Sequence, residues 1–152
     1  MSDRILQLLP LACQWIEDQE IFILANGIPL SEDQQIDAHL VGVSDPRKVR
    51  LLKVAQIPFP SDTAIQSAME ETGMLTTGSI GLSLRYGIFL RDDHWQDRSV
   101  IVHELTHTMQ YERMGGIGNF LRQYVEECIA HGYFNSPMET EARETERRIT
   151  QQ

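Results

Sequence analysis

Five consecutive residues, His103-Glu104-Leu105-Thr106-His107, carry the H-E-x-x-H pattern, whose residue types and spacing suit a metal ion. On a helix, positions i and i+4 lie on one face about one turn apart, so two imidazole rings can bind the same ion. The glutamate between them then lies beside the remaining coordination position, where it can accept a proton from water. The pattern therefore predicts a Zn²⁺ site with His103 and His107 as metal ligands and Glu104 as the catalytic base.

A hydrolytic zinc site of this kind needs a third protein ligand, which the motif does not supply. A metzincin would carry a glycine and a histidine three and six positions after His107, but Gln110 and Arg113 stand there. A carboxylate from a later helix remains, and the candidates are Glu127, Glu139 and Glu141.

Helical spacing alone leaves these three candidates open. Glu127 falls at the boundary of the apolar stripe of its helix, which favours a surface residue. Glu139 and Glu141 flank the apolar line of the last helix on opposite sides, so their positions around the helix do not show which of them is the ligand. Glu139 also completes a capping-box pattern with Ser136, in which its carboxylate would instead accept a hydrogen bond from a backbone N–H.

The C-terminal half of the chain resembles small bacterial zincin-type metallopeptidase domains of the DUF4157 kind. The resemblance rests on the H-E-x-x-H motif and on Glu139-Thr140-Glu141-Ala142-Arg143, which is similar to the E-x-E-A-D or E-x-E-A-N block of gluzincins. It implies that Glu139 is the third zinc ligand. The residue four positions later usually supports a ligand histidine, and Arg143 departs from that pattern, so Glu141 stays an alternative.

Apolar periodicity predicts six helices and two strands. Together with the resemblance it predicts an α+β, zincin-like fold that is mostly helical, with a small sheet packed beside the H-E-x-x-H helix. The chain is expected to be a single domain (1–152), with a metal-site core over 81–150 and a less defined N-terminal part over 1–60. We predict helices over 5–25, 32–41, 63–71, 98–114, 117–131 and 137–149, and strands over 49–57 and 81–91.

Three details of this pattern bear on the site. Ile101 and Leu105 recur at helical spacing, so one stripe of the motif helix should be buried. Asp93 or Asp97 should cap the motif helix. The strand from Leu82 to Leu90 is the candidate edge for pairing with an extended substrate.

Composition limits the classes of function. A net charge of −9 over 152 residues argues against nucleic acid as the main partner, because binding to phosphates needs a positive surface. The N-terminus lacks a sustained apolar run, so we expect no membrane span and, by default, a cytoplasmic protein. Cys13 and Cys128 are far apart in sequence and are expected to be reduced, mostly buried thiols.

The sequence thus predicts a zinc-dependent metallopeptidase or related hydrolase that acts on a peptide or protein. Metal-activated water would attack a peptide carbonyl with Glu104 as general base. Tyr133 and His131 are candidates for stabilising the oxyanion, although the position of His131 favours a core histidine. The alternatives are a non-catalytic metal-binding or regulatory module on a zincin scaffold, and an α-rich domain without metal.

Overall fold

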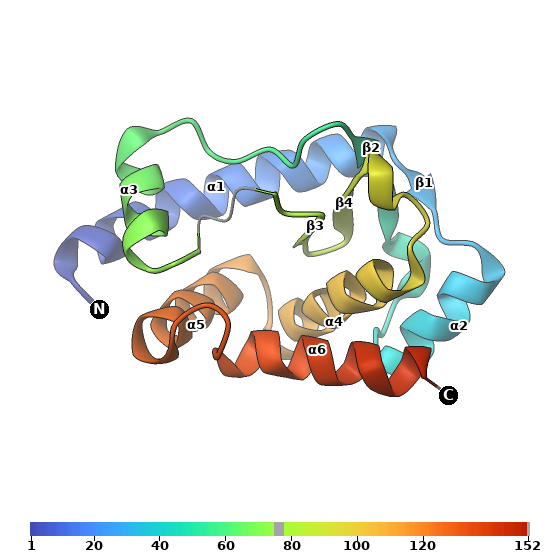
Figure 1. The fold of residues 1–152 in the computed structure, drawn as a ribbon. Coiled ribbons are helices and arrows are strands. Elements are labelled where there is room, and N and C mark those ends of the chain that lie inside the picture. Colours follow the sequence, from blue (N-terminus) through green and yellow to red (C-terminus); the bar gives the residue numbers. More distant parts are fainter. Residues whose placement is uncertain (75–77, 152) are drawn as a thin grey trace.

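The protein is described by a computed structural model that covers residues 1–74 and 78–151. Within these ranges the chain forms six α-helices and a four-stranded sheet, which confirms the α+β class (Figure 1). The helices lie close to their predicted positions. They are α1 (Asp3–Asn26), α2 (Glu32–Val41), α3 (Thr63–Glu71), α4 (Arg98–Met114), α5 (Ile117–His131) and α6 (Pro137–Thr150).

The sheet has the order β1-β2-β4-β3, in which β2 and β4 are parallel and the other two pairs are antiparallel. Its strands are β1 (Ile28–Pro29), β2 (Arg50–Val54), β3 (Gly81–Leu84) and β4 (Gly87–Arg91). The predicted strand over 49–57 corresponds to the shorter β2, and β1 was not predicted.

The predicted single strand over 81–91 is wrong, because the chain reverses at Arg85 and Tyr86 to form the β3–β4 hairpin. Arg85 adopts a left-handed conformation with φ 65° to make this turn. Apolar alternation runs on across both strands, so no break in the pattern marks the reversal. Of the predicted edge, only β3 lies at the end of the sheet formed by the described residues, whereas β4 lies inside it.

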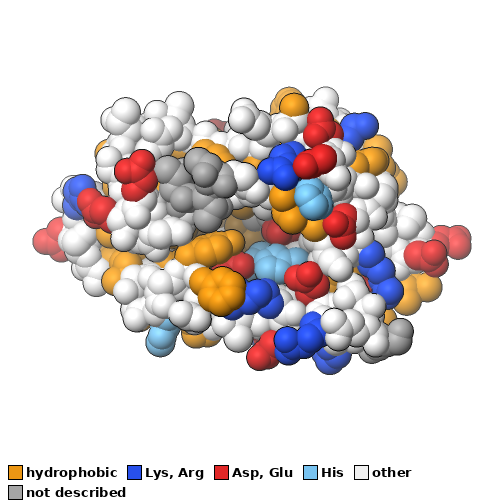
Figure 2. Space-filling view, viewed as in Figure 1, with side chains coloured by type: hydrophobic (Ala, Val, Ile, Leu, Met, Phe, Trp, Pro, Cys, Tyr) orange, Lys and Arg blue, Asp and Glu red, His pale blue; other side chains and the backbone are white. Residues whose placement is uncertain are grey.

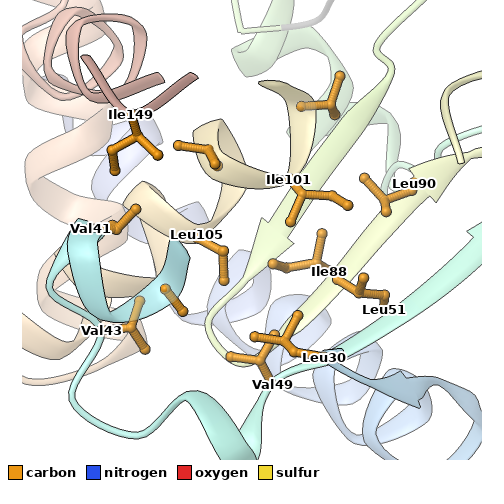
Figure 3. Close-up of a cluster of buried hydrophobic side chains, with 13 residues drawn as sticks. Leu30, Val41, Val43, Val49, Leu51, Ile88, Leu90, Ile101, Leu105 and Ile149 are labelled. Carbon is orange, nitrogen blue, oxygen red and sulfur yellow. The ribbon is translucent and has the colours of Figure 1, made fainter. Parts of the chain in front are cut away.

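Helices cover both faces of the sheet. Successive side chains of β4 point to opposite faces, and those on each face pack against different helices. Ile88 and Leu90 join one buried cluster with residues of α2, α4 and α6, which Figure 3 shows around Ile101 and Leu105. Phe89 joins a second cluster with residues of α1 and α5. The sheet therefore fixes α1 on one side and α4 on the other.

The motif helix α4 has defined ends. Asp97 accepts hydrogen bonds from the backbone N–H groups of Ser99 and Val100, so it is the cap, and Asp93 is not. Gly115 ends the helix in the left-handed conformation with φ 87°. The expected buried stripe is present, since Ile101 and Leu105 are almost fully buried.

Helix α6 packs along α4 and completes the core beside the motif. Its buried side chains recur at helical spacing and include one carboxylate: Met138, Glu139, Ala142, Thr145 and Ile149. In the described part of the chain, no helix combines the length and the apolar character needed to cross a bilayer, and this includes the 24-residue α1.

Candidate metal centre

Helix α4 brings the two motif histidines together. The ring centroids of His103 and His107 are 5.1 Å apart, and the rings meet edge to face. His107 is buried at 7% exposure, and its ring also lies against Phe120 and Tyr124 of α5. Packing on the neighbouring helix therefore fixes the orientation of this imidazole.

Glu139 of α6 joins both imidazole rings. Its Oε1 lies 3.1 Å from Nε2 of His103, and its Oε2 lies 2.9 Å from Nε2 of His107. One possible ligand atom from each of the three residues lies within 4.8 Å of the others, so the cluster could hold a metal ion. Of the three predicted carboxylates, Glu139 is the one that meets the histidines.

Glu141 lies on the other side of α6 and supports the site indirectly. Its carboxylate accepts hydrogen bonds from Gln110 at 2.7 Å and from Arg113 at 2.8 and 3.0 Å. The hydrogen bond from Arg113 is the main cause that lowers the pKa of Glu141. Gln110 in turn places its Oε1 2.7 Å from Nδ1 of His107.

Glu127 has a structural role that the sequence did not reveal. Its carboxylate accepts a hydrogen bond from the backbone N–H of Met138 at 2.9 Å and thus satisfies the first turn of α6. The capping box predicted for Ser136 and Glu139 is absent, since Ser136 donates to the carbonyl of Tyr133 at 3.0 Å instead. Glu139 is thereby left to face α4.

Both histidines also have a partner at Nδ1, away from the shared carboxylate. Oε2 of Glu146 lies 3.1 Å from Nδ1 of His103, and Gln110 takes the same role for His107. Such partners fix the ring orientation and the tautomer of metal-binding histidines. Arg143, where the resemblance placed a supporting acid, lies over the ring of Phe134 at 4.0 Å. Glu146 fills that role one turn later.

Glu104 lies beside the histidines, and it lines a cavity that His103, His107 and Glu139 also line. It is 7% exposed, and burial raises the pKa of its carboxyl above the ordinary value. Gly81 makes room for it, because a Cβ at this position would lie 3.1 Å from Cγ and 3.2 Å from Oε2 of Glu104. The edge strand β3 thus limits how the side chain of Glu104 can be placed.

The charges of the cluster support one another. Burial alone would lower the pKa of His107, but the charge of Glu139 outweighs it and raises the value to about 9. Burial would raise the pKa of Glu139, but the charges and hydrogen bonds of both histidines hold it far below the usual range. A buried carboxylate between two imidazoles thus stays ionised.

Two tyrosines differ in their relation to the cluster. The hydroxyl of Tyr124 donates to Oε2 of Glu139 at 2.6 Å, a contact that the sequence analysis missed because Tyr124 fits the apolar stripe of α5. Tyr133 lines the cavities beside Glu104. His131 is exposed, so its expected place in the core is wrong.

Two cavities meet at the cluster, and Figure 2 shows a hollow with histidine and acidic side chains inside it. The two share His103, Glu104 and Tyr133 and then diverge along α4. One continues past His107 and Tyr111 between α1, α3 and α5. The other extends past Val100 toward Glu146. A molecule in either cavity can thus reach the cluster.

The cluster offers three possible donors beside open space. Two imidazole nitrogens and one carboxylate oxygen are a ligand set that hydrolytic zinc sites use, and the adjoining cavity leaves room for a further ligand. Comparison of the chain with protein-family models, curated proteins and solved structures found no match. The interpretation of the site therefore rests on its own residues.

Proposed function

We propose that the protein is a zinc-dependent hydrolase that cleaves peptide-type amide bonds at the cluster of His103, His107 and Glu139. The observation that carries this proposal is the position of Glu104, which is buried beside the ligand atoms and lines the cavity next to them. A zinc ion held there would polarise a substrate carbonyl and make water more acidic.

The roles of the protein's own groups follow from their places. Glu104 accepts a proton from the attacking water and passes it to the leaving amine, and burial raises the pKa of its carboxyl above the ordinary value. Glu146 and Gln110 hold the two imidazoles through Nδ1. Tyr133 lines both cavities, and in this mechanism it would donate a hydrogen bond to the oxyanion.

Substitution of the base tests the proposal. We expect Glu104→Gln to retain zinc and to lose turnover by roughly 100- to 10,000-fold, the usual contribution of a general base. Cleavage of a peptide library by the unaltered protein should stop when a chelator is added. Glu112→Gln is the matched control on the same helix, because Glu112 bonds to Tyr86 and Ser44 away from the cluster. A Glu104→Gln protein as active as the control would refute the mechanism.

A non-catalytic metal-binding module is the second candidate. The departure from the gluzincin pattern at Arg143, where an acid is missing, would favour such a module, but Glu146 provides a carboxylate at His103. If the protein is such a module, it should bind zinc stoichiometrically. The peptide library should then show no cleavage that a chelator stops. The same assay therefore separates the two functions.

A further inference from the structure

One of the two cavities beside the cluster is mostly apolar and is lined by several elements. Its volume is about 190 Å³, and it extends from His103 and Glu139 into the space between α1, α3, β3 and α5. One wall is a continuous stripe of α1: Ile5, Leu8, Leu9, Ala12, Trp15 and Ile16. Four of these side chains (Leu8, Leu9, Ala12 and Trp15) are only half-buried, so part of this apolar wall is accessible to solvent. An apolar occupant would remove that surface from water.

The length of this wall indicates an extended occupant. The stripe from Ile5 to Ile16 spans about 16 Å of helix at 1.5 Å per residue. An extended saturated chain of this length contains on the order of a dozen carbon atoms, given bonds of about 1.5 Å between them. A single amino-acid side chain would cover only part of this wall.

The polar groups along the wall are already bonded within the protein. The hydroxyl of Thr72 donates to the carbonyl of Ala68 at 2.9 Å, and that of Tyr111 donates to the carbonyl of Ser83 at 3.3 Å. Tyr124 donates to Glu139. A peptide lying along the α1 wall would have to leave its backbone N–H and C=O groups there without partners, which is costly away from water. An aliphatic chain has no such groups.

Polar and ionisable groups gather at one end of the cavity. His103, Glu104, His107 and Glu139 lie there, and the second cavity leads from them toward the carboxylate of Glu146. A substrate that fits both cavities has an apolar chain on one side of its reactive carbonyl and a polar, amine-bearing part on the other.

We propose that the apolar cavity binds the acyl chain of a long-chain N-acyl amide, whose carbonyl lies at the cluster. This inference rests on the proposed hydrolase function and names its substrate class. Water adds its oxygen to the amide carbonyl, the C–N bond breaks, and the products are an amine and a fatty carboxylic acid, which then releases its proton to solvent. Glu104 carries the proton from water to the amine nitrogen, and no group is oxidised or reduced.

Binding of fatty acids tests the cavity separately from catalysis. We expect calorimetry on the protein as purified to show affinity that rises from butanoate through octanoate to dodecanoate, by up to about fourfold per methylene. The gain should stop near dodecanoate, where the wall ends. Because all probes share one carboxylate, the trend reports the chain and not the head group.

Two substitutions, one on α1 and one on α3, should shorten the cavity. Ala12→Phe on α1 and Ala68→Phe on α3 both add a ring to the lining. We expect each to abolish the gain beyond octanoate while butanoate binds as before, which also shows that the variant is folded. The matched controls are Ala25→Phe and Ala64→Phe, exposed alanines of the same two helices, which should bind like the unaltered protein.

The outcomes separate this inference from the proposed function. Affinity that does not depend on chain length, or that is equal in the cavity variants and their controls, would overturn the acyl-chain proposal. Chelator-sensitive cleavage of unmodified peptides, with no cleavage of dodecanoyl amides, would overturn it and leave the hydrolase proposal standing. Chain-dependent binding with no hydrolysis of any amide would refute the hydrolase proposal, while the ligand class of the cavity would stand.

Discussion

Oε2 of Glu146 lies 3.1 Å from Nδ1 of His103, on the side of the ring opposite to Glu139. The imidazole is therefore held between two carboxylates of α6 that are two turns apart. One carboxylate can share a metal ion with the ring, and the other sets which nitrogen carries the proton.

Loss of this partner should weaken metal binding. We expect Glu146→Ala to lower zinc affinity roughly 10- to 100-fold, and Glu146→Gln to lower it less because its amide oxygen can still accept from Nδ1–H. Competition with a fluorescent chelator measures both. Glu144→Ala, an exposed glutamate of the same helix, is the control. Equal affinities of the Glu146→Ala and control proteins would contradict the role.

The two carboxylates in the E-x-E block should behave differently. Glu139→Ala removes a possible ligand and should leave the protein without zinc after dialysis, whereas Glu141→Ala should retain it, because Glu141 acts only through Gln110 and Arg113. Elemental analysis of both dialysed proteins measures their zinc content. Retention of zinc by Glu139→Ala together with its loss from Glu141→Ala would show that the assignment is reversed.

Substitution of Gly81 should lower kcat without changing metal binding. Its added Cβ would lie 3.0 Å from Val100 and 3.1 Å from Glu104, so the base must shift by a few tenths of an ångström. We expect Gly81→Ala to lower kcat about tenfold with unchanged zinc content, because catalysis is sensitive to small displacements. Gly118→Ala, where nothing lies within 4 Å of the added atom, should be as active as the unaltered protein. An unaffected kcat in Gly81→Ala would show that Glu104 is not so constrained.

The hairpin turn should contribute to stability through a partly buried ion pair. Glu20 is 2% exposed and accepts from Arg85 at 2.6 and 2.8 Å and from the backbone of Tyr86 at 3.0 Å. Because the Arg85 side chain is 36% exposed, solvent screens the pair, and we expect Arg85→Ala to cost about 1–3 kcal/mol in the free energy of unfolding.

Urea unfolding of Arg122→Ala provides the comparison. This arginine pairs with Glu126 on the exposed face of α5, and its loss should cost less than about 0.5 kcal/mol. Similar costs for the two arginines would mean that the Glu20 pair contributes no more than a surface ion pair.

Tyr86 should give a stability change at high pH. Burial and its hydrogen bond to Glu112 raise its pKa to about 12 from the ordinary value of 10. The folded state thus favours the neutral phenol, so this contribution is complete below pH 10 and is lost as the pH rises from 10 to 12. Ultraviolet titration should show one late-ionising tyrosine fewer in Tyr86→Phe. If the late step is unchanged in that variant, the assignment to Tyr86 fails.

The sequence by itself determined the local features of the site. His103, Glu104 and His107 lie together because four residues make about one helical turn, whatever packs around them. The helix ends were also largely predictable, since Asp97 and Gly115 act through contacts within a few residues. The α+β class followed from the same local patterns.

Only the tertiary structure decided how distant elements meet. Glu139 and Glu141 differ by roughly 200° around their helix, and the rotation of α6 depends on how Ala142 and Ile149 pack against the core beside α4. The reversal at Arg85 was hidden because its strands share one apolar pattern.

Local sequence patterns likewise could not predict the partner of His103 or the apolar cavity. Glu146 acts on a residue of another helix, and the cavity is formed by α1, α3, β3 and α5 together. Helical spacing fixes the direction of a side chain on its own helix. Packing between helices fixes what that side chain meets.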